Sequence, residues 1–115
     1  MIVEERIYRI RTGKSAEFLK HYEQLGMAPQ RRILGNLAGY YRSEIGELNL
    51  IVHMWAYEDL NDRARRRAQL MQDAGFRSFL DAAVPLIEHQ QNRILEPAAF
   101  FAPVLKAMLE AGSKV

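Results

Sequence analysis

The chain has 115 residues, of which 49% are hydrophobic and 26% charged, values that predict one globular domain and exclude disordered and collagen-like proteins. Its 16 Lys and Arg residues exceed its 14 Asp and Glu residues by only two, a smaller basic excess than nucleic-acid-binding proteins usually show. It contains no cysteine, which excludes thiol catalysis, cysteine-ligated zinc and disulfides.

Two features of the chain concern its location. Glu4 and Glu5 stand where a signal or transit peptide would have an apolar or acid-free run, so Met1 is expected to begin the mature protein. The apolar runs are far shorter than the roughly 20 residues that span a bilayer. Together with the lack of cysteine, these features predict a cytoplasmic protein without an integral membrane segment.

The first two predicted elements are a strand and a helix. Residues 2–11 combine β-branched and aromatic side chains with charges, which is typical of a strand. From Ser15, which is expected to cap the helix, apolar residues recur at intervals of three and four as far as Leu25. Pro29 leaves open whether residues 31–34 extend this helix or form a separate turn.

Two strand-like segments follow and are expected to pair as a hairpin. Gly46 and Glu47 separate residues 37–45 from residues 48–57, and a glycine at the first position of a two-residue link satisfies a type II′ turn. The second segment is apolar on both faces, whereas the helices of one small domain cover only one side of a sheet. We therefore expect the face with Trp55 to lie opposite the helices, covered by a partner subunit.

The remaining elements complete a familiar order. Asp59 is expected to cap a helix, residues 76–83 to form another helical piece, and the weakly patterned residues 88–95 to form a last strand. The order β-α-β-β-α-β predicts an α+β, ferredoxin-like fold with a four-stranded antiparallel sheet. Residues 1–103 would form this domain and residues 104–115 a C-terminal helical tail or arm. Two such sheets facing each other would make a dimeric α/β barrel enclosing a cavity.

One stretch of the chain is recognisable as a family signature. The sequence GYYRSEIGELNLIVHMWAYEDLNDRARRRAQL, at residues 39–70, resembles that of the NIPSNAP family. Arg6 and Tyr8 match its R-x-Y element, and ILEPAAFFAP at 94–103 is similar to its closing segment. The resemblance therefore covers about residues 2–103.

The departures from the family pattern are mild, chiefly Glu47 where Pro is expected and Phe76 where Trp is expected. The resemblance implies a ferredoxin-like fold and a homodimeric α/β barrel, with poorly defined biochemical activity. Eukaryotic relatives are associated with mitochondria and with proposed trafficking or mitophagy roles. The acidic start of this chain predicts a compact, bacterial-type member instead.

One side of the predicted strand 48–57 combines a histidine with aromatic residues. His53, Trp55 and Tyr57 share that side, and Tyr8 and Arg6 are expected to join them from the first strand. We predict that these five residues bind ligand. A neutral imidazole among aromatic rings would be the best acid–base or ligand-orienting group available, so His53 is the first catalytic candidate. The alternative is a hydrogen-bonded interface histidine without a chemical role.

Glu44, beside the predicted turn, is the second catalytic candidate. A carboxylate at a cavity mouth could act as a base or hold a polar ligand. The alternative is an ion pair with Arg42 or Arg6.

An arginine-rich helix follows, but it is not expected to bind nucleic acid. Asp59 and Asp62 precede Arg63 and Arg66 by four residues each, the spacing of ion pairs on a solvated helix face. A metal site is not expected either, because no ligand-spaced cluster exists and the first strand should separate His53 from His89. No GxSxG, Walker A or GxGxxG motif is present, so no cofactor is predicted.

These observations support two hypotheses. The first is a homodimer whose cavity binds a small apolar or aromatic metabolite, extended by fold analogy alone to cofactor-free chemistry. The second is a non-catalytic protein-interaction module, adaptor-like, with recognition through the arginine-rich helix and the tail around Phe100. A solvent-accessible pocket near His53 would favour the first, and a packed interior the second.

Overall fold

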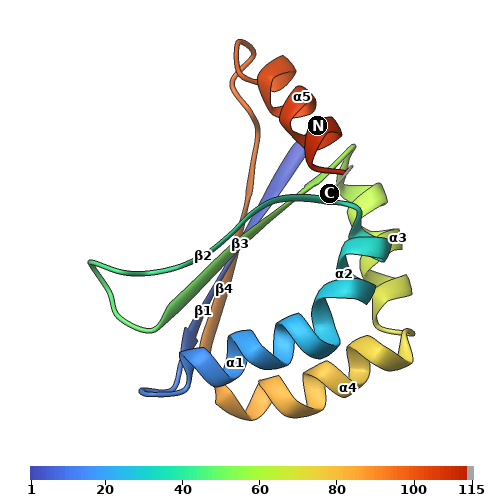
Figure 1. Cartoon of the computed structure of the whole chain (residues 1–115). Coiled ribbons are helices and arrows are strands. Elements are labelled where there is room, and N and C mark those ends of the chain that lie inside the picture. Colours follow the sequence, from blue (N-terminus) through green and yellow to red (C-terminus); the bar gives the residue numbers. More distant parts are fainter. Residues whose placement is uncertain (114–115) are drawn as a thin grey trace.

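The fold is seen in a computed structural model, which describes residues 1–113. One antiparallel sheet has the strand order β2-β3-β1-β4. Its strands are β1 (Ile2–Ile10), β2 (Asn36–Arg42), β3 (Leu50–Tyr57) and β4 (Ile87–Leu95). The predicted ferredoxin-like α+β fold is confirmed, and β1 does lie between β3 and β4 (Figure 1).

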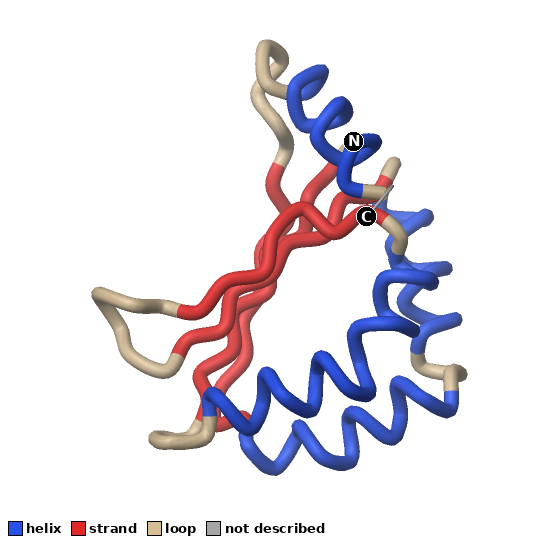
Figure 2. Tube along the Cα trace, in the orientation of Figure 1, coloured by secondary structure: helices blue, strands red, loops and turns tan. Residues whose placement is uncertain are grey.

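Helices α1–α4 lie along one face of the sheet, and α5 lies apart from them at the end of the sheet where β1 begins (Figures 1 and 2). The helical elements are α1 (Ser15–His21), the π-type turn η1 (Tyr22–Gly26), α2 (Met27–Leu34), α3 (Leu60–Leu70), α4 (Ala74–Ala83), the 3₁₀ turn η2 (Val84–Leu86) and α5 (Ala102–Gly112). Within residues 1–113, no helix combines the length and apolarity needed to cross a membrane.

The first helical segment continues past Pro29 to Leu34. Proline lacks the N–H that would bond to the carbonyl four residues earlier, and the wider turn η1 immediately precedes the helix that contains it. The prediction that Ser15 caps this segment is wrong. A turn through Gly13, at φ +82°, brings the chain into the helix one residue earlier, with Lys14 at the cap position and no side-chain hydrogen bond there.

The link between β2 and β3 is longer than the predicted two-residue turn. Residues 43–49 join the strands and project from one end of the sheet (Figure 1). Ser43 closes the loop, because its N–H donates to the Leu50 carbonyl at 3.0 Å and its hydroxyl accepts from the Leu50 N–H at 3.2 Å. Asn49 adopts φ +66°, a left-handed conformation that asparagine tolerates, and its carbonyl accepts from Ile10 at 2.8 Å.

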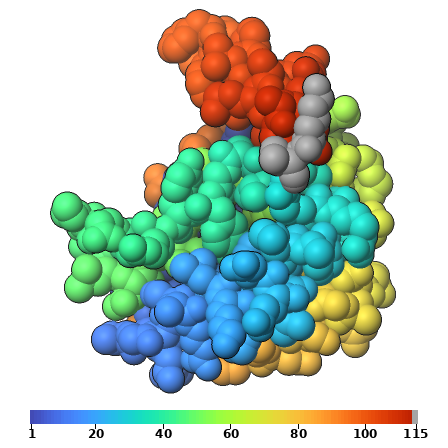
Figure 3. Space-filling view, viewed as in Figure 1, coloured from blue at the N-terminus to red at the C-terminus, as the bar shows by residue number. Residues whose placement is uncertain are grey.

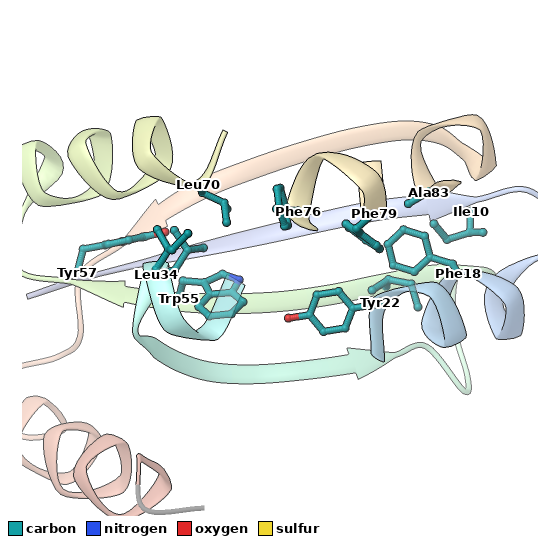
Figure 4. Close-up of a cluster of buried hydrophobic side chains, with 12 residues drawn as sticks. Ile10, Phe18, Tyr22, Leu34, Trp55, Tyr57, Leu70, Phe76, Phe79 and Ala83 are labelled. Atoms are coloured by element: carbon teal, nitrogen blue, oxygen red, sulfur yellow. The ribbon is translucent and has the colours of Figure 1, made fainter. Parts of the chain in front are cut away.

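The prediction for the two faces of β3 is wrong: the face with Trp55 lies against the helices, not opposite them. Trp55 and Tyr57 are buried beneath the helices, in the main hydrophobic core (Figure 4). Leu50, Val52 and Met54 face the other way and are half-buried. The helices cover the aromatic face because its large side chains fill the space between sheet and helices. The other face, which we call the open face, has the smaller apolar set.

The helix starts after β3 follow the expected chemistry. Asp59 caps α3 as predicted, since its carboxylate accepts from the Asp62 N–H at 2.7 Å. Asp73 does the same for α4 at Phe76, at 2.8 Å, a cap that was not predicted from the sequence.

Part of the C-terminal segment forms a helix that packs on the sheet. Leu105 of α5 contacts Val3 and Ala56 in a second, smaller core on the open face. The space-filling view shows α5 as a lobe above the body of the molecule (Figure 3). Residues 114 and 115, the end of the predicted tail, lie outside the described part of the chain.

Candidate functional site

A cavity of about 250 Å³ lies between the sheet and helices α1–α4. Aromatic and aliphatic side chains of α1, α4 and β4 form one part of its wall. The polar side chains in the wall are Arg6, Tyr8, Tyr22, Gln30, Tyr40, His53, Arg67 and Gln90. An apolar cavity with a few convergent polar groups is the usual form of a small-molecule site.

The strand register places the central polar residues in one row across the sheet. Arg6 on β1 is paired with His53 on β3 and with Asn92 on β4, and His53 is paired with Tyr40 on β2. Directly paired residues point to the same face, so all four side chains face the helices. All four strands thus contribute one residue each to the floor beneath the helices.

His53 is held in one tautomer. Its side chain is 1% exposed, and its Nδ1 accepts a hydrogen bond of 2.7 Å from the indole Nε1–H of Trp55. Because an indole N–H can only donate, the imidazole proton is on Nε2, and this atom has no partner within residues 1–113. The ring stacks on Tyr40 at 4.9 Å and meets the edge of Tyr8 at 5.0 Å.

The electrostatic surroundings keep His53 neutral. Burial lowers its pKa from 6.5 to about 3, and the positive charges of Arg6 and Arg67 act in the same direction against the opposing charge of Glu4. The imidazole therefore presents an N–H donor, rather than a basic nitrogen, at neutral pH.

A buried carboxylate lies one row further along β1. Glu4 is fully buried, and its Oε2 accepts hydrogen bonds from Arg63 at 2.6 Å, Asn92 at 2.8 Å and Arg6 at 3.1 Å. Burial alone would raise the pKa of Glu4, but the bonds from Arg63 and Asn92 and the charge of Arg6 outweigh it and lower the pKa to about 2. Glu4 is thus ionised.

The arginine-rich helix is only partly the solvated face that was predicted. The pair between Asp62 and Arg66 is confirmed at 2.8 Å, and Arg65 also reaches Asp62 at 2.8 Å. Arg63 instead turns inward to Glu4, so its predicted pairing with Asp59 is wrong. The physical reason is that Glu4 is buried and anionic beneath α3, whereas Asp59 is engaged as the helix cap.

Arg67, one turn after Arg63 on α3, lines the cavity. Within residues 1–113, no carboxylate oxygen lies within 4.0 Å of its guanidinium. Burial lowers the pKa of Arg67, and the neighbouring charge of Arg6 adds to this effect.

The structure brings together some of the predicted site residues and separates others. Arg6, Tyr8 and His53 line the cavity. Trp55 and Tyr57 do not line it: Trp55 donates a hydrogen bond to His53, and Tyr57 is buried further along β3. Glu44 lies elsewhere, in the exposed loop after β2, with an ion pair to Arg42 at 2.9 Å.

The predicted separation of the two histidines is also seen. His53 and His89 lie on strands with β1 between them, and His89 is paired with Arg9 on the open face. In the described part of the chain, no group of three or more His, Cys, Asp or Glu residues is arranged to hold a metal ion.

Sequence reasoning missed Glu4, Tyr40, Arg67 and Asn92. The alternation Glu4, Arg6, Tyr8 in the first strand is a signal that could have placed the carboxylate on the same face as its partners. β4 looked weakly patterned because its residues toward the helices include amides, which bond to polar neighbours instead of packing in the core. Arg67 resembles its exposed neighbours in sequence, and only the rotation of α3 distinguishes it.

Comparison with known proteins gives consistent matches over most of the chain. The sequence model of the NIPSNAP family matches residues 3–102. The chain is 34% identical over 97 residues to "Protein NipSnap homolog 2" of Homo sapiens and 33% identical over 97 residues to that of Danio rerio. Each match covers 84% of this chain and 33% of the relative, so the chain spans about a third of the length of these relatives.

Solved structures extend the comparison to three dimensions. A NIPSNAP family protein from Agrobacterium tumefaciens is 50% identical, with a TM-score of 0.84 over 86% of this chain and 94% of that one. A NIPSNAP-like domain protein from Burkholderia xenovorans is 48% identical, with a TM-score of 0.83 over 86% of each chain. A Pseudomonas aeruginosa protein at 14% identity shares the fold alone, with a TM-score of 0.60 over 85% of this chain and 94% of that one.

Proposed function

The chain belongs to the NIPSNAP family, which includes a solved member of unknown function, and we propose that it binds a small apolar or aromatic molecule in the cavity beside His53. The proposed site lies within one subunit, between the sheet and the helices. It replaces the expected location between two facing sheets, because the aromatic face of β3 is covered by the chain's own helices.

One observation supports this proposal above the others. His53 Nε2, the Tyr22 hydroxyl and Gln30 Oε1 are buried atoms in residues that line the cavity, and none has a hydrogen-bond partner within residues 1–113. Buried polar atoms in folded proteins are almost always paired, and an unpaired one costs about 1–3 kcal/mol. Six buried side-chain atoms lack a partner within residues 1–113, and three of them belong to residues around this one cavity, which supports a bound molecule with polar groups there.

The size of the cavity sets the size of the molecule. An engineered cavity of about 150 Å³ in another protein accepts benzene, so the volume of about 250 Å³ here fits an aromatic ring with a short substituent. Phe18, Phe79 and Leu80 provide the apolar wall. Phe18 and Phe79 are in edge-to-face contact, with their ring centroids 5.8 Å apart, and an aromatic ligand could make the same kind of contact with either ring.

The chemistry of His53 favours an orienting role over proton transfer. A general base works best with a pKa near the working pH, whereas the pKa of His53 is lowered to about 3. Its fixed Nε2–H would instead donate to an acceptor on the ligand. Glu44 lies outside this cavity, and the proposal assigns it no role.

We also propose that the open face is covered by a second copy of the chain. Ile7, Leu50 and Val52 lie on it as half-buried apolar side chains, beyond the patch that α5 covers. A homodimer would bury them and leave the helix-covered cavity of each subunit intact.

An interaction module is the alternative function. Ile45 in the loop after β2 is 94% exposed, and Phe100 before α5 is 86% exposed. Exposed apolar residues in two projecting segments would fit recognition of a protein partner. In that case the cavity would hold only water.

The experiment is a ligand screen with two independent readouts. The purified chain is mixed with small aromatic acids, amides, phenols and quinones, and its melting temperature is measured together with the indole N–H resonance of Trp55, the chain's one tryptophan. Binding to the native state raises the melting temperature. Because that indole N–H donates to His53, a ligand in the cavity is expected to shift its resonance as well.

A cavity-filling variant locates the binding. Leu80→Phe enlarges a half-buried wall residue and is expected to abolish both signals. Leu60→Phe makes the same change at a residue that is 59% exposed, and it should leave both signals as in the wild type. No response from the folded wild-type protein to any compound would reject the proposal in favour of the interaction module.

A further inference from the structure

The cavity has an excess of positive charge at one part of its wall. Arg6 and Arg67 line the cavity, and Arg63 lies beneath α3 beside them. Glu4 is the one carboxylate that Arg6 and Arg63 bind within residues 1–113, and both use the same oxygen, Oε2. Two guanidinium groups thus share one carboxylate, and the third, that of Arg67, has no ion pair in the same part of the chain.

This imbalance has an energetic consequence. A half-buried guanidinium without a counterion is unfavourable, since burial penalises the charged form. Burial and the positive charge of Arg6 lower the pKa of Arg67, as expected for a guanidinium without a counterion. The neighbouring Arg65 and Arg66 have no such deficit, because both are paired with Asp62.

The cavity wall changes character along β1. Arg6 is paired with His53 and Tyr8 with Gln90, while Ile10, four residues after Arg6, is paired with Ile87. At roughly 3.4 Å per residue, the charged and the aliphatic parts of the floor are about 14 Å apart. A ligand held at the charged end and lying along β1 would therefore direct its other end toward the apolar surface.

From these observations we infer that the cavity selects a small amphipathic carboxylate, whose anionic group is bound by Arg67 and the Nε2–H of His53 and whose apolar group points toward Ile87. This inference rests on the proposed function and specifies the chemical class of the ligand. A carboxylate has two acceptor oxygens in one plane, which fit a guanidinium and an imidazole N–H together.

A neutral ligand would satisfy only part of the site. An amide or ketone oxygen could accept from His53 Nε2–H but would leave the charge of Arg67 uncompensated. Charge-assisted hydrogen bonds are about twice as strong as neutral ones, so the site should distinguish an acid from its amide.

The test compares matched probes. Binding of 3-phenylpropionate, 3-phenylpropionamide and 2-phenylethylphosphonate to the full chain is measured by titration of the Trp55 indole N–H resonance. The carboxylate is expected to bind roughly tenfold more tightly than the amide, as one charge-assisted contact would give. Equal affinities for acid and amide, or tighter binding of the phosphonate, would overturn the inference.

Two variants on the same helix assign the preference to Arg67. Arg67→Gln is expected to reduce the ratio of acid to amide affinity to near one. Arg65→Gln, at a side chain that is 70% exposed and paired with Asp62, should preserve the ratio. The Arg67 variant should fold, because its charge makes no ion pair within residues 1–113.

The outcomes separate this inference from the proposed function. If the amide and the acid both bind the wild type with equal affinity, the cavity is a ligand site without a carboxylate preference. If no probe binds but another compound of the ligand screen does, the inference fails and the proposed function stands; if nothing binds in either experiment, both fail. An unchanged acid preference in Arg67→Gln would also reject the inference, since the anion would then be held elsewhere.

Discussion

Glu4 and Glu5 are consecutive residues of β1, and each forms a short ion pair with an arginine: 2.6 Å from Glu4 to Arg63 and 2.7 Å from Glu5 to Arg93. Their surroundings differ completely. The Glu4 side chain is fully buried under α3 and accepts three hydrogen bonds, whereas Glu5 is on the open face beside Arg93, which is 59% exposed. Similar distances therefore describe unequal interactions, because solvent screens the second pair more strongly than the first.

The contrast extends to the whole sheet. The helix-covered face contains buried ionised and neutral polar groups that depend on each other, with the cavity among them. The open face contains half-buried apolar residues and solvated ion pairs. A substitution on the covered face should thus disturb several partners at once, while one on the open face should act locally.

The largest expected effect is the loss of the Glu4 charge. Glu4→Gln leaves Arg6 and Arg63 without their shared counterion, and breaking a buried pair in this way costs about 3–5 kcal/mol. The free energy of unfolding, measured by urea denaturation, should fall by that amount. Glu5→Gln is the matched control, since loss of a solvated pair should cost less than about 1 kcal/mol. Equal effects of the two substitutions would contradict the difference between the faces.

The fold was predictable to the level of element order, because hydrophobic period and cap chemistry are local signals. The sequence did not determine which face of β3 the helices cover. β3 is apolar on both sides, so alternation alone does not say which side the helices cover. The strand residues of the site were predictable, because strand geometry places His53 and Tyr8 on one face. The helix residues were not, because the inward turn of Arg63 and Arg67 depends on how α3 is rotated over the sheet.

The second expected effect is a loss of stability in mild acid. The pKa of His53 is about 3 when folded and 6.5 in the reference state, so below pH 6.5 the unfolded chain binds a proton that the folded chain does not. Stability should fall as the pH decreases from 6.5, by up to about 1.4 kcal/mol per pH unit. Glu4 acts in the same direction, but only below pH 4.5, since its pKa is lowered from 4.5 to about 2.

The window from pH 6.5 to 4.5 separates the contribution of His53 from that of Glu4. Urea denaturation at several pH values should show a steeper decline for the wild type than for His53→Asn, which has no titrating group at this position. Imidazole nitrogen chemical shifts of the wild type provide a second measurement, and they should show His53 still neutral at pH 4.5. Protonation of His53 near pH 6.5 in the folded protein would show that the covered face is more open to solvent than this structure indicates.

The smallest expected effects come from two neighbours on β3 that face opposite sides. Ile51→Val removes one methylene from a fully buried side chain and should cost about 0.5–1.5 kcal/mol at every protein concentration. Val52→Thr replaces a methyl by a hydroxyl on the half-buried open face, and at low protein concentration it should change the free energy of unfolding very little.

If a second copy covers this face, the cost of Val52→Thr should grow with protein concentration, because dimerisation would then contribute to stability and the hydroxyl would be desolvated. Light scattering should give a mass of about twice 13.3 kDa for the wild type under those conditions. A wild-type mass near 13.3 kDa, with both variants independent of concentration, would show that the open face is solvated in the native protein.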